Sequence, residues 1–387
     1  MCPHAKQGEM EKKMKKNILV VFHDNKLSSG ATKSFLSNVE YFLKKGHKVI
    51  AAVPNKNGDL STYLNKIGIV VYSMNYGGNV YGYSKSKLKL IKNYLRCLIK
   101  TIVSLYSSKK LEKILINEKI SVVYSNTSTC YFGAWIAKCL EVDHYWHFRE
   151  FCFEDQNSLR IWKEHFIKLA KGSKKIFTIS KVLNNYYINK YVFSNTKMLY
   201  NDISPLYIND SHIKHDNVNI LITGTISEAK GQIYAIKAIE KLSNPSVKLF
   251  IAGEVNEYAR SLMEYTKNKN IKNIEFCGLL NDMKKLREKV DMSIVCAKQE
   301  AFGRTIIEDM LNGIIVIGCD SGAVIELVRN YETGYIYKYG DIDDLCNKIV
   351  ECIDNTRKKE IRANAFQFAK NFTRNFTAIE VERMVSK

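Results

Sequence analysis

Proline and glycine are scarce in this sequence. Its 387 residues include 4 Pro and 20 Gly, while 46% are hydrophobic and 25% are charged. This composition is typical of a globular protein and leaves little room for a long disordered linker or a low-complexity tail. Because a single hydrophobic core seldom grows beyond about 250–300 residues, the length favours two domains.

Long apolar runs and paired cysteines are also missing. No run reaches the roughly 18 apolar residues that cross a bilayer. Residues 1–16 are polar and lysine-rich, without the apolar core of a secretory signal, and Met14 is a candidate start. The ten cysteines are scattered, with no Cys-x-x-Cys pair, so we expect them to be reduced. These absences predict a cytoplasmic protein.

The first half of the chain contains few acidic residues. Residues 1–200 contain 33 Lys and Arg but 13 Asp and Glu, whereas residues 201–387 contain 26 of each. The whole net charge of +20 therefore falls in the first half. This excess predicts an anionic partner, which could be a membrane surface, a phosphorylated lipid or a nucleic acid.

Short apolar runs alternate with amphipathic segments such as Thr32–Lys45 and Ser128–Leu140 along the chain. This alternation predicts an α/β fold with doubly wound parallel sheets. The predicted strands are Asn17–Phe22, Lys48–Val53, Ile69–Met74, Val122–Tyr124, Tyr145–Phe148, Lys175–Ile179, Val218–Thr223, Val247–Ala252, Asn273–Phe276, Met292–Cys296 and Ile314–Gly318.

A polar stretch interrupts the alternation and divides the chain. We expect a polar extension at 1–16, a Rossmann-like domain at 17–200, a linker at 201–217, a second Rossmann-like domain at 218–356, and helices at 357–387 that return to the first domain. Two such sheets create a central cleft facing the carboxyl ends of their strands, where ligands of open α/β folds bind.

The strongest local signal is the segment from Glu300 to Met310, which follows the predicted strand Met292–Cys296. Gly303 opens the next helix, whose free N–H groups and positive dipole end suit a diphosphate. Glu300 could then accept hydrogen bonds from sugar hydroxyls, and Glu308 could hold a ribose diol. From spacing alone, a first-turn dipole partner and an exposed helix carboxylate are the more economical interpretations.

Two further loops follow strands. Lys230, in the loop after Val218–Thr223, could project its ammonium toward phosphate oxygens. Gly30 follows the first strand in a Ser-Ser-Gly-Ala-Thr segment and would let a ligand approach the backbone closely. A solvated lysine and a plain helix cap explain these two features equally well.

His147 is expected at the carboxyl end of a strand, where its side chain would face the cleft, although a structural hydrogen-bonding role is common for such a histidine. Asp341 and Asp343 superficially match an Asp-x-Asp metal site. They directly precede a predicted helix, so capping is the favoured interpretation. We expect no metal and no other cofactor.

Taken together, these segments resemble the glycosyltransferase family 4 group of retaining GT-B enzymes, also called group 1 glycosyltransferases, over nearly the whole chain. Glu300 and Glu308 stand at the two ends of that family's Glu-x7-Glu motif. Similar segments are Phe302-Gly303 within the motif, Gly313–Gly318, Ser321-Gly322, Glu326-Leu327, Thr333-Gly334, Phe177–Ser180 and Tyr200-Asn201.

The resemblance implies an N-terminal acceptor-binding domain and a C-terminal domain that binds the nucleotide sugar. Glu300 would contact the donor sugar, Glu308 the ribose, Lys230 the diphosphate and His147 the transferred sugar, with Gly30 under the diphosphate. These roles make His147, Glu300 and Lys230 the expected catalytic residues. The expected donor-binding residues are Gly30, Thr225, Lys230, Glu300, Phe302, Gly303, Arg304, Thr305 and Glu308.

The chain departs from the family at two positions, with Thr225 where an arginine is usual and Ser29-Gly30 where a Gly-Gly pair is usual. Loss of the arginine removes a cation from the leaving group's surroundings. Lys230 and the helix at Gly303 must then hold more of the charge, unless Arg304 or another basic group substitutes.

The implied reaction is transfer of a hexose or N-acetylhexosamine from a nucleoside diphosphate sugar, with UDP favoured, by same-face attack. The implied acceptor is a lipid-linked glycan or a polysaccharide of the cell surface, such as O-antigen or capsule. The alternatives are a sugar-nucleotide epimerase or inverting transferase of the same fold, and a non-catalytic sugar-nucleotide binder. No recognised nucleic-acid motif accompanies the basic residues, so a nucleic-acid partner is disfavoured.

A basic stripe and an apolar stripe run along one predicted helix. Such a helix suits an anionic membrane on the inner face of the cell. In the competing interpretation, the apolar stripe packs on the core and the lysines face water. The basic stripe comprises Lys85, Lys89, Lys92, Arg96 and Lys100, and the apolar stripe Leu88, Ile91, Leu95, Leu98, Ile102 and Leu105.

Overall fold

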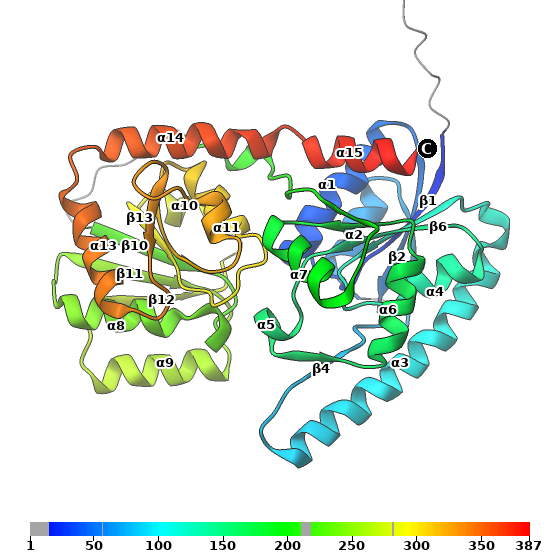
Figure 1. Cartoon of the computed structure of the whole chain (residues 1–387), viewed down its shortest axis with the longest axis horizontal. Helices are drawn as coiled ribbons and strands as arrows, with labels where there is room; N and C mark the ends of the chain where they lie inside the picture. The colour runs from blue at the N-terminus through cyan, green and yellow to red at the C-terminus, as the bar shows by residue number, and fades with distance from the viewer. Residues whose placement is uncertain (1–14, 56, 210–217, 281) are drawn as a thin grey trace, which may run out of the picture.

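The computed structural model describes residues 15–55, 57–209, 218–280 and 282–387. They form two lobes, each built around a parallel sheet (Figure 1). The predicted α/β class with two parallel sheets is confirmed. Most of the expected N-terminal extension, and residues 210–217 of the expected linker, lie outside the described residues.

The first sheet has seven parallel strands in the order β3-β2-β1-β5-β6-β8-β9. Its central strands are hydrophobic and buried, as expected for a sheet with helices on both faces. The strands are β1 (Asn17–Val21), β2 (Lys48–Pro54), β3 (Val70–Met74), β5 (Val122–Asn126), β6 (Asp143–Phe148), β8 (Lys175–Thr178) and β9 (Thr196–Met198).

Helices connect these strands. The Ser29 side chain caps the first of them by accepting a hydrogen bond from the Thr32 N–H. The first-lobe helices are α1 (Gly30–Lys44), α2 (Asp59–Lys66), α3 (Lys87–Leu115), η1 (Ile116–Glu118), α4 (Phe132–Cys139), α5 (Phe153–Gln156), α6 (Lys163–Gly172) and α7 (Lys181–Tyr191).

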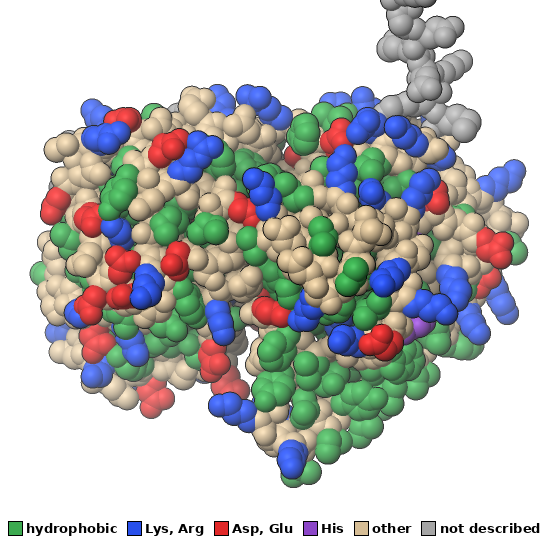
Figure 2. Space-filling model, in the orientation of Figure 1, with side chains coloured by type: hydrophobic (Ala, Val, Ile, Leu, Met, Phe, Trp, Pro, Cys, Tyr) green, Lys and Arg blue, Asp and Glu red, His purple; other side chains and the backbone are tan. Residues whose placement is uncertain are grey.

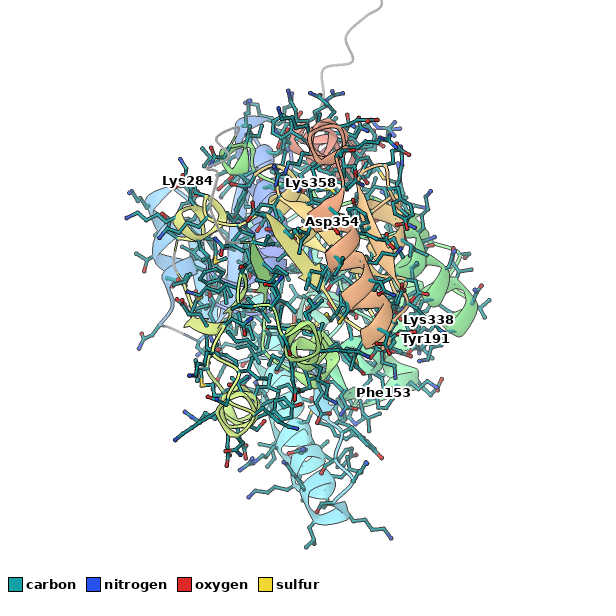
Figure 3. All side chains as sticks on the ribbon, turned by 90° about the vertical axis from the view of Figure 1, so that its left-hand side faces the viewer. Phe153, Tyr191, Lys284, Lys338, Asp354 and Lys358 are labelled. Carbon is teal, nitrogen blue, oxygen red and sulfur yellow. The ribbon has the colours of Figure 1, made fainter. Side chains whose placement is uncertain are left out.

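The first lobe also contains a small sheet that the sequence did not predict. Strands β4 (Val80–Gly82) and β7 (Ser158–Arg160) pair in antiparallel fashion. Each has three residues, too few to show a period-two pattern. This pair lies beside α3, the longest helix of the described chain, which projects from the lobe (Figures 1 and 3).

The second sheet has six parallel strands in the order β12-β11-β10-β13-β14-β15. Five of its strands match predicted ones, and β15 was missed. The strands are β10 (Val218–Thr223), β11 (Val247–Ala252), β12 (Ile274–Gly278), β13 (Met292–Val295), β14 (Ile315–Cys319) and β15 (Gly334–Tyr337). The helices are η3 (Glu228–Lys230), α8 (Gln232–Leu242), α9 (Glu257–Asn268), α10 (Lys284–Arg287), α11 (Arg304–Met310), α12 (Val324–Leu327) and α13 (Ile342–Asp354).

The chain crosses between the lobes twice. After β9 it passes through η2 (Pro205–Tyr207) into the second lobe, and α14 (Lys358–Lys370) with η4 (Asn371–Thr373) brings it back. The last helix, α15 (Phe376–Val385), packs against α1 (Figure 1). There the Tyr145 hydroxyl donates to the Met384 carbonyl at 2.7 Å, which ties the end of the chain to the first sheet.

Both sheets reverse their strand order at one place, between β1 and β5 in the first lobe and between β10 and β13 in the second. The loops that leave the carboxyl ends of these strands diverge and open a crevice. The loops after β1, β10 and β13 are those that carry most of the predicted site residues.

Candidate functional site

A cleft of about 830 Å³ separates the two lobes at these strand ends. The first lobe contributes the loop after β1 and the start of α1, and the second contributes the loops after β10, β11 and β13. Seven of the predicted donor residues line the cleft: Gly30, Thr225, Lys230, Glu300, Arg304, Thr305 and Glu308.

Glu300 joins two groups that can bind an anion. One carboxylate oxygen, Oε2, lies 2.6 Å from Lys230 Nζ, and the other, Oε1, accepts a hydrogen bond from the Gly303 N–H at 3.1 Å. Burial opposes the charge on Lys230, but Glu300 and the nearby Asp155 raise the pKa of its ammonium above the ordinary value. Lys230 is therefore a fixed cation at the beginning of α11.

Two glycines allow these groups to come together. Gly231 has φ +69°, and a Cβ there would lie 2.5 Å from the Cys296 carbonyl oxygen, so glycine brings the Lys230 loop against the end of β13. Gly322 has φ +60°, and a Cβ there would lie 2.4 Å from the Glu300 backbone nitrogen. A side chain at either position would be strained and would displace a neighbouring backbone.

Glu308 is buried and held by two arginines. Arg304 Nε lies 2.7 Å from one of its oxygens and Arg287 Nη2 lies 2.8 Å from the other. Arg287 also donates to Asp309 at 2.8 Å, and these two acidic partners raise the pKa of Arg287 despite its burial. Both guanidinium groups lie over the Tyr207 ring. The sequence reading missed Arg287 because it precedes the motif and α10 has only four residues.

Arg304 also spans the cleft. Its Nη1 donates to the Ser34 hydroxyl of α1 at 3.0 Å. Gly30, the first residue of α1, faces the same side chain, and a Cβ at Gly30 would lie 4.0 Å from Arg304 Cδ. Thr225 is exposed in the cleft and carries no charge. Cations of the first lobe, Lys26 and Lys33, line the cleft instead and were missed.

The structure corrects the expected position of His147. The residue ends β6 as predicted, but its side chain is fully buried, and Nδ1 lies 2.7 Å from the Tyr124 hydroxyl. Nε2 has no hydrogen-bond partner among the described residues. Burial and the charge of Arg149 hold the pKa of His147 well below its usual range. The expectation that His147 faces the cleft is therefore wrong.

A polar cluster at the carboxyl ends of β1, β5 and β6 was also missed. Asn126 donates to His23 Nδ1 at 3.2 Å and accepts from Arg149 Nε at 2.6 Å. His23 lies 3.3 Å from Asp24. Burial, with a smaller contribution from the charge of Arg304, lowers the pKa of Arg149 to about 10. Each of these residues ends or closely follows a strand, the positional signal that could have identified them.

Asp155 lies in α5, which follows the carboxyl end of β6 in the first sheet. Its carboxylate accepts hydrogen bonds from the N–H groups of Phe151 and Cys152 at 3.0 and 2.8 Å. Burial and the charge of Glu150 nevertheless raise the pKa of Asp155 to about 7, although the nearby Lys230 opposes this shift. Asp155 thus places a group that titrates near neutrality close to the Lys230–Glu300 pair.

Phe302 also differs from expectation. Its ring is 2% exposed and packs against Tyr200 and Phe372, with ring centroids 6.1 and 6.0 Å away. This packing joins the lobes where the chain crosses between them, so the Phe302 side chain does not line the cleft. Glu326 reinforces the same junction, because its carboxylate accepts from the N–H groups of Lys181 and Val182 at the start of α7.

The remaining expectations concern the surface. Asp341 caps α13 by accepting from the Asp344 N–H at 3.0 Å, so the predicted capping role is confirmed. Within the described ranges, no group of three or more His, Cys, Asp or Glu side chains could hold a metal ion. None of the described helices is long and apolar enough to cross a membrane. The predicted basic residues Lys85, Lys89, Lys92, Arg96 and Lys100 are all exposed on α3 or just before it.

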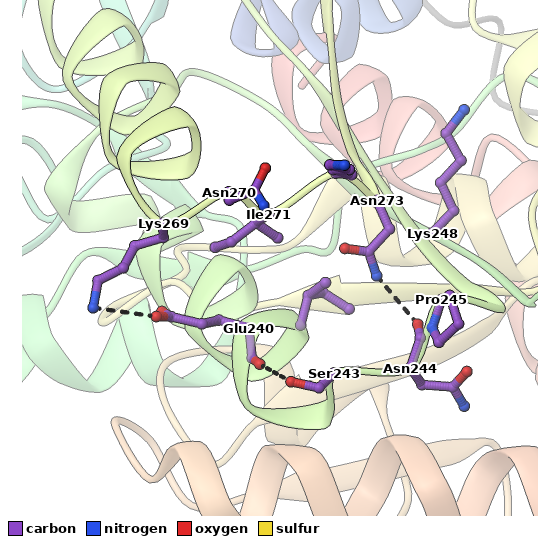
Figure 4. A pocket seen from close by; sticks show the side chains of 11 residues that line it. Glu240, Ser243, Asn244, Pro245, Lys248, Lys269, Asn270, Ile271 and Asn273 are labelled. Atoms are coloured by element: carbon purple, nitrogen blue, oxygen red, sulfur yellow. Dashed lines mark hydrogen bonds and ion pairs between the residues drawn. The ribbon is translucent and has the colours of Figure 1, made fainter.

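A second hollow, of about 670 Å³, lies at the opposite end of the second sheet, beside the amino ends of β11 and β12 (Figure 4). Its polar groups interact with one another. Lys269 lies 3.5 Å from Glu240, and Asn273 donates to the Asn244 carbonyl at 3.2 Å. The ligand-binding features described above converge in the cleft between the lobes.

Comparison with known proteins agrees with this arrangement. Residues 205–371 match the family model described as "Glycosyl transferases group 1". An "Uncharacterized 42.6 kDa protein in cps region" of Klebsiella pneumoniae is 25% identical over 340 residues, 82% of this chain and 87% of that protein. The N-acetyl-alpha-D-glucosaminyl L-malate synthase of Bacillus anthracis is 22% identical over 154 residues, 39% of each chain.

Solved structures show the same fold. The Anabaena protein Alr3699/HepE, in complex with UDP and glucose, superposes with a TM-score of 0.76 at 18% identity, covering 96% of this chain and 100% of that one. A glycosyltransferase from Rickettsia africae superposes with a TM-score of 0.75 at 18% identity, covering 96% and 98%. The fold is GT-B, and the family match supports a glycosyltransferase of the group 1 superfamily.

Proposed function

We propose that this chain is a retaining hexosyltransferase that uses a nucleoside diphosphate sugar, preferably a UDP-sugar. It transfers a hexose or N-acetylhexosamine to a lipid-linked or polysaccharide acceptor during assembly of a cell-surface polysaccharide. We further propose that it works peripherally on the cytoplasmic face of the membrane.

The observation that carries this proposal is the Lys230–Glu300 pair at the start of α11. Lys230 Nζ and the Gly303 N–H are held within 2.6 and 3.1 Å of one carboxylate, on the wall of the cleft. A donor diphosphate that entered here would meet a fixed ammonium and the free N–H groups of a helix start. Glu300, freed in part from these donors, would accept hydrogen bonds from hydroxyls of the donor sugar.

Charge development supports a catalytic role for Lys230. In glycosyl transfer the sugar becomes positive while negative charge grows on the departing diphosphate. A cation fixed beside the diphosphate therefore stabilises the transition state more than the ground state. The leaving phosphate of a retaining transferase would help to take the proton of the attacking acceptor hydroxyl on the same face of the sugar.

Three other cations could supply the charge of the arginine that the family usually has at position 225. Arg304 extends across the cleft, and Lys26 and Lys33 line its opposite wall. We propose that these cations share the diphosphate charge with Lys230. Glu308, already paired with Arg287 and Arg304, would accept a ribose hydroxyl through the face of its carboxylate that opens to the cleft.

The relatives support the finer parts of the proposal. A relative in a cps region supports a role in surface polysaccharide. A solved structure of the same fold contains UDP and glucose, which supports a UDP-sugar donor. The excess of basic residues in the first lobe supports an anionic, lipid-linked acceptor.

The test is a thermal-shift and hydrolysis screen of the full chain with uridine, guanosine and adenosine diphosphate sugars. One donor should raise the melting temperature by several degrees at saturation and be hydrolysed slowly. Glu300→Ala and Lys230→Ala should lose both effects. Glu332→Ala, which removes an exposed carboxylate of the same lobe, should retain them. Equal responses of all variants would show that the donor does not bind at Lys230 and Glu300. Binding without any turnover would indicate a non-catalytic sugar-nucleotide binder.

A further inference from the structure

Helix α3 presents the reverse of the usual amphipathic arrangement. The side that faces the lobe consists largely of small polar side chains, which hydrogen-bond to the loop before β4. Asn79 donates to the Thr101 hydroxyl at 3.0 Å, the Gly77 N–H donates to Ser104 at 3.2 Å, and Ser107 donates to the Asn75 carbonyl at 2.8 Å. The buried residues of α3 are Cys97, Thr101, Ser104, Ser107, Ser108, Leu111 and Leu115.

The opposite side of α3 is apolar and exposed. Leu88 is 82% exposed, Ile99 64% and Tyr106 74%. Apolar positions that recur every three or four residues form one continuous stripe on a helix. We call this stripe, which comprises Leu88, Ile91, Leu95, Ile99, Ile102 and Tyr106, the α3 apolar face.

This surface is large for a protein that is free in water. Figure 2 shows hydrophobic side chains gathered over the projecting α3 region, and in Figure 3 the helix extends beyond the rest of the molecule. Single exposed hydrophobic residues are common, but a contiguous exposed patch marks a site that binds a partner or a membrane. Of the six residues of the predicted apolar stripe, four are exposed, so the interpretation in which the whole stripe packs on the core does not hold. Leu98 is partly buried, and Leu105 packs against the core.

Cations flank the α3 apolar face. The helix carries eight Lys or Arg residues and one acidic residue. Lys92 and Arg96 lie next to the α3 apolar face by helical spacing, and Lys89 follows one row further round. The Lys100 side chain extends along Gly77 of the loop before β4. All four lysine and arginine residues are exposed. Among the described residues, none of these four forms an ion pair with a carboxylate. Their charges are therefore available to an external anionic partner.

We propose that the α3 apolar face inserts into the headgroup region of an anionic lipid bilayer, with Lys89, Lys92 and Arg96 on its phosphates. Charge favours this occupant over a second copy of the chain. Two α3 helices packed face to face would bring two rows of cations together, which is unfavourable, whereas anionic lipid satisfies both the apolar and the basic stripes.

A neighbouring aromatic hollow extends the lipid-facing surface. A cavity of about 530 Å³ is lined by Leu105 of α3, Trp135 and Trp162, with Lys138 and His165 at its side. Trp162 is 37% exposed, whereas Trp135 and Trp146 are 4% and 0% exposed. Tryptophan is favoured at the boundary between headgroups and acyl chains. Trp162 is therefore placed to enter the interface together with α3.

Docking by α3 does not depend on the chemistry of the cleft, but its use in catalysis rests on the proposed function. If the acceptor is lipid-linked, α3 would hold the first lobe against the membrane from which that acceptor projects. Vesicle binding and donor binding can be measured separately, so the failure of one proposal is distinguishable from the failure of the other.

The test is flotation of the full chain with vesicles of phosphatidylcholine and phosphatidylglycerol, and with vesicles of phosphatidylcholine alone. We expect binding to the anionic vesicles that weakens as salt rises. The double variant Leu95→Glu/Ile99→Glu should reduce vesicle partitioning by at least about tenfold. The matched control is Phe376→Glu/Ile379→Glu, which changes two exposed residues of α15, across the first lobe from α3 in Figure 1.

Two further measurements make the result decisive. Both double variants should keep the wild-type melting temperature and its shift with donor. Lipids brominated on their acyl chains should quench the fluorescence of Trp162, and Trp162→Phe should abolish most of that quenching. Absence of vesicle binding, or equal loss in the α15 control, would overturn the proposal. A wild-type dimer that Leu95→Glu/Ile99→Glu converts to a monomer, without vesicle binding, would instead identify the α3 apolar face as an interface between copies.

Discussion

The two lobes hold the charged and polar groups near their strand ends in different ways. On the second lobe, charged groups form direct pairs, between the loops that hold Lys230 and Glu300 and within α11 between Arg304 and Glu308. On the first lobe, polar groups at the ends of three strands form a buried network around Asn126 and Arg149. Carboxylate–cation pairs that line the cleft can open to share their charge with a diphosphate, whereas a buried network mainly fixes the shape of its lobe.

This difference predicts that the Lys230–Glu300 pair is catalytic and that the buried first-lobe groups are structural. The largest expected effect is that of Lys230→Met, which removes the fixed cation. Loss of one preorganised charge at a developing anion lowers kcat by about 10²–10³-fold. Steady-state transfer kinetics with the donor found in the screen would measure it. Lys237→Met, which changes an exposed lysine of α8, is the control, and equal rates in the two variants would contradict the assignment.

His147→Ala tests the structural role of the buried groups of the first lobe. Because the ring is fully buried beside Tyr124 and Phe177, its removal should lower the free energy of unfolding by about 2–4 kcal/mol. Turnover well below the melting temperature should change less than about tenfold. Urea denaturation and kcat would be measured together, with the partly exposed His165→Ala as the reference. A large fall in kcat at wild-type stability would restore His147 as a catalytic residue.

Gly322→Ala tests how the Glu300 loop is held. The new Cβ would meet the Glu300 backbone at 2.4 Å in a residue with φ +60°. Gly340→Ala is a matched control, since Gly340 has φ +79° and no atom within 4 Å of the Cβ position among the described residues. The control should cost about 1 kcal/mol of stability from backbone strain alone. Gly322→Ala should lower stability by more than the control and should weaken donor binding. Identical effects of the two substitutions would show that a Cβ at position 322 does not meet the Glu300 backbone.

The smallest effect concerns Asp155 and pH. Its pKa of about 7 lies above that of an unfolded aspartate, so the folded chain binds this proton more tightly. Stability should therefore be highest below pH 4 as far as this group is concerned, and should fall as pH rises toward 7 and above. Asp155→Asn should flatten the fall in melting temperature between pH 5 and pH 8. An unchanged slope would show that Asp155 titrates normally.

Prediction from sequence worked best where local spacing carries the information. The eight-residue spacing of Glu300 and Glu308, and the loop that holds Lys230, lie within short segments that follow buried strands. Such segments direct their side chains to the carboxyl edge of a parallel sheet whatever the rest of the fold does. Arg287, by contrast, reaches Glu308 from another connection of the sheet, and no spacing in the sequence links the two.

The sequence by itself determined the α/β class, most strands of both sheets and the positions of Lys230, Glu300 and Glu308 after buried strands, because strand burial and helix starts are local properties. Tertiary structure decided that the His147 side chain is buried and does not face the cleft, because this depends on neighbours such as Tyr124 and Phe177 from other strands. It also decided the orientation of α3. Hydrophobic periodicity shows that a helix has two faces but not which one packs. Here the hydroxyls of Thr101 and Ser104 accept hydrogen bonds from the loop before β4, which holds the polar face on the lobe and leaves the apolar face outside.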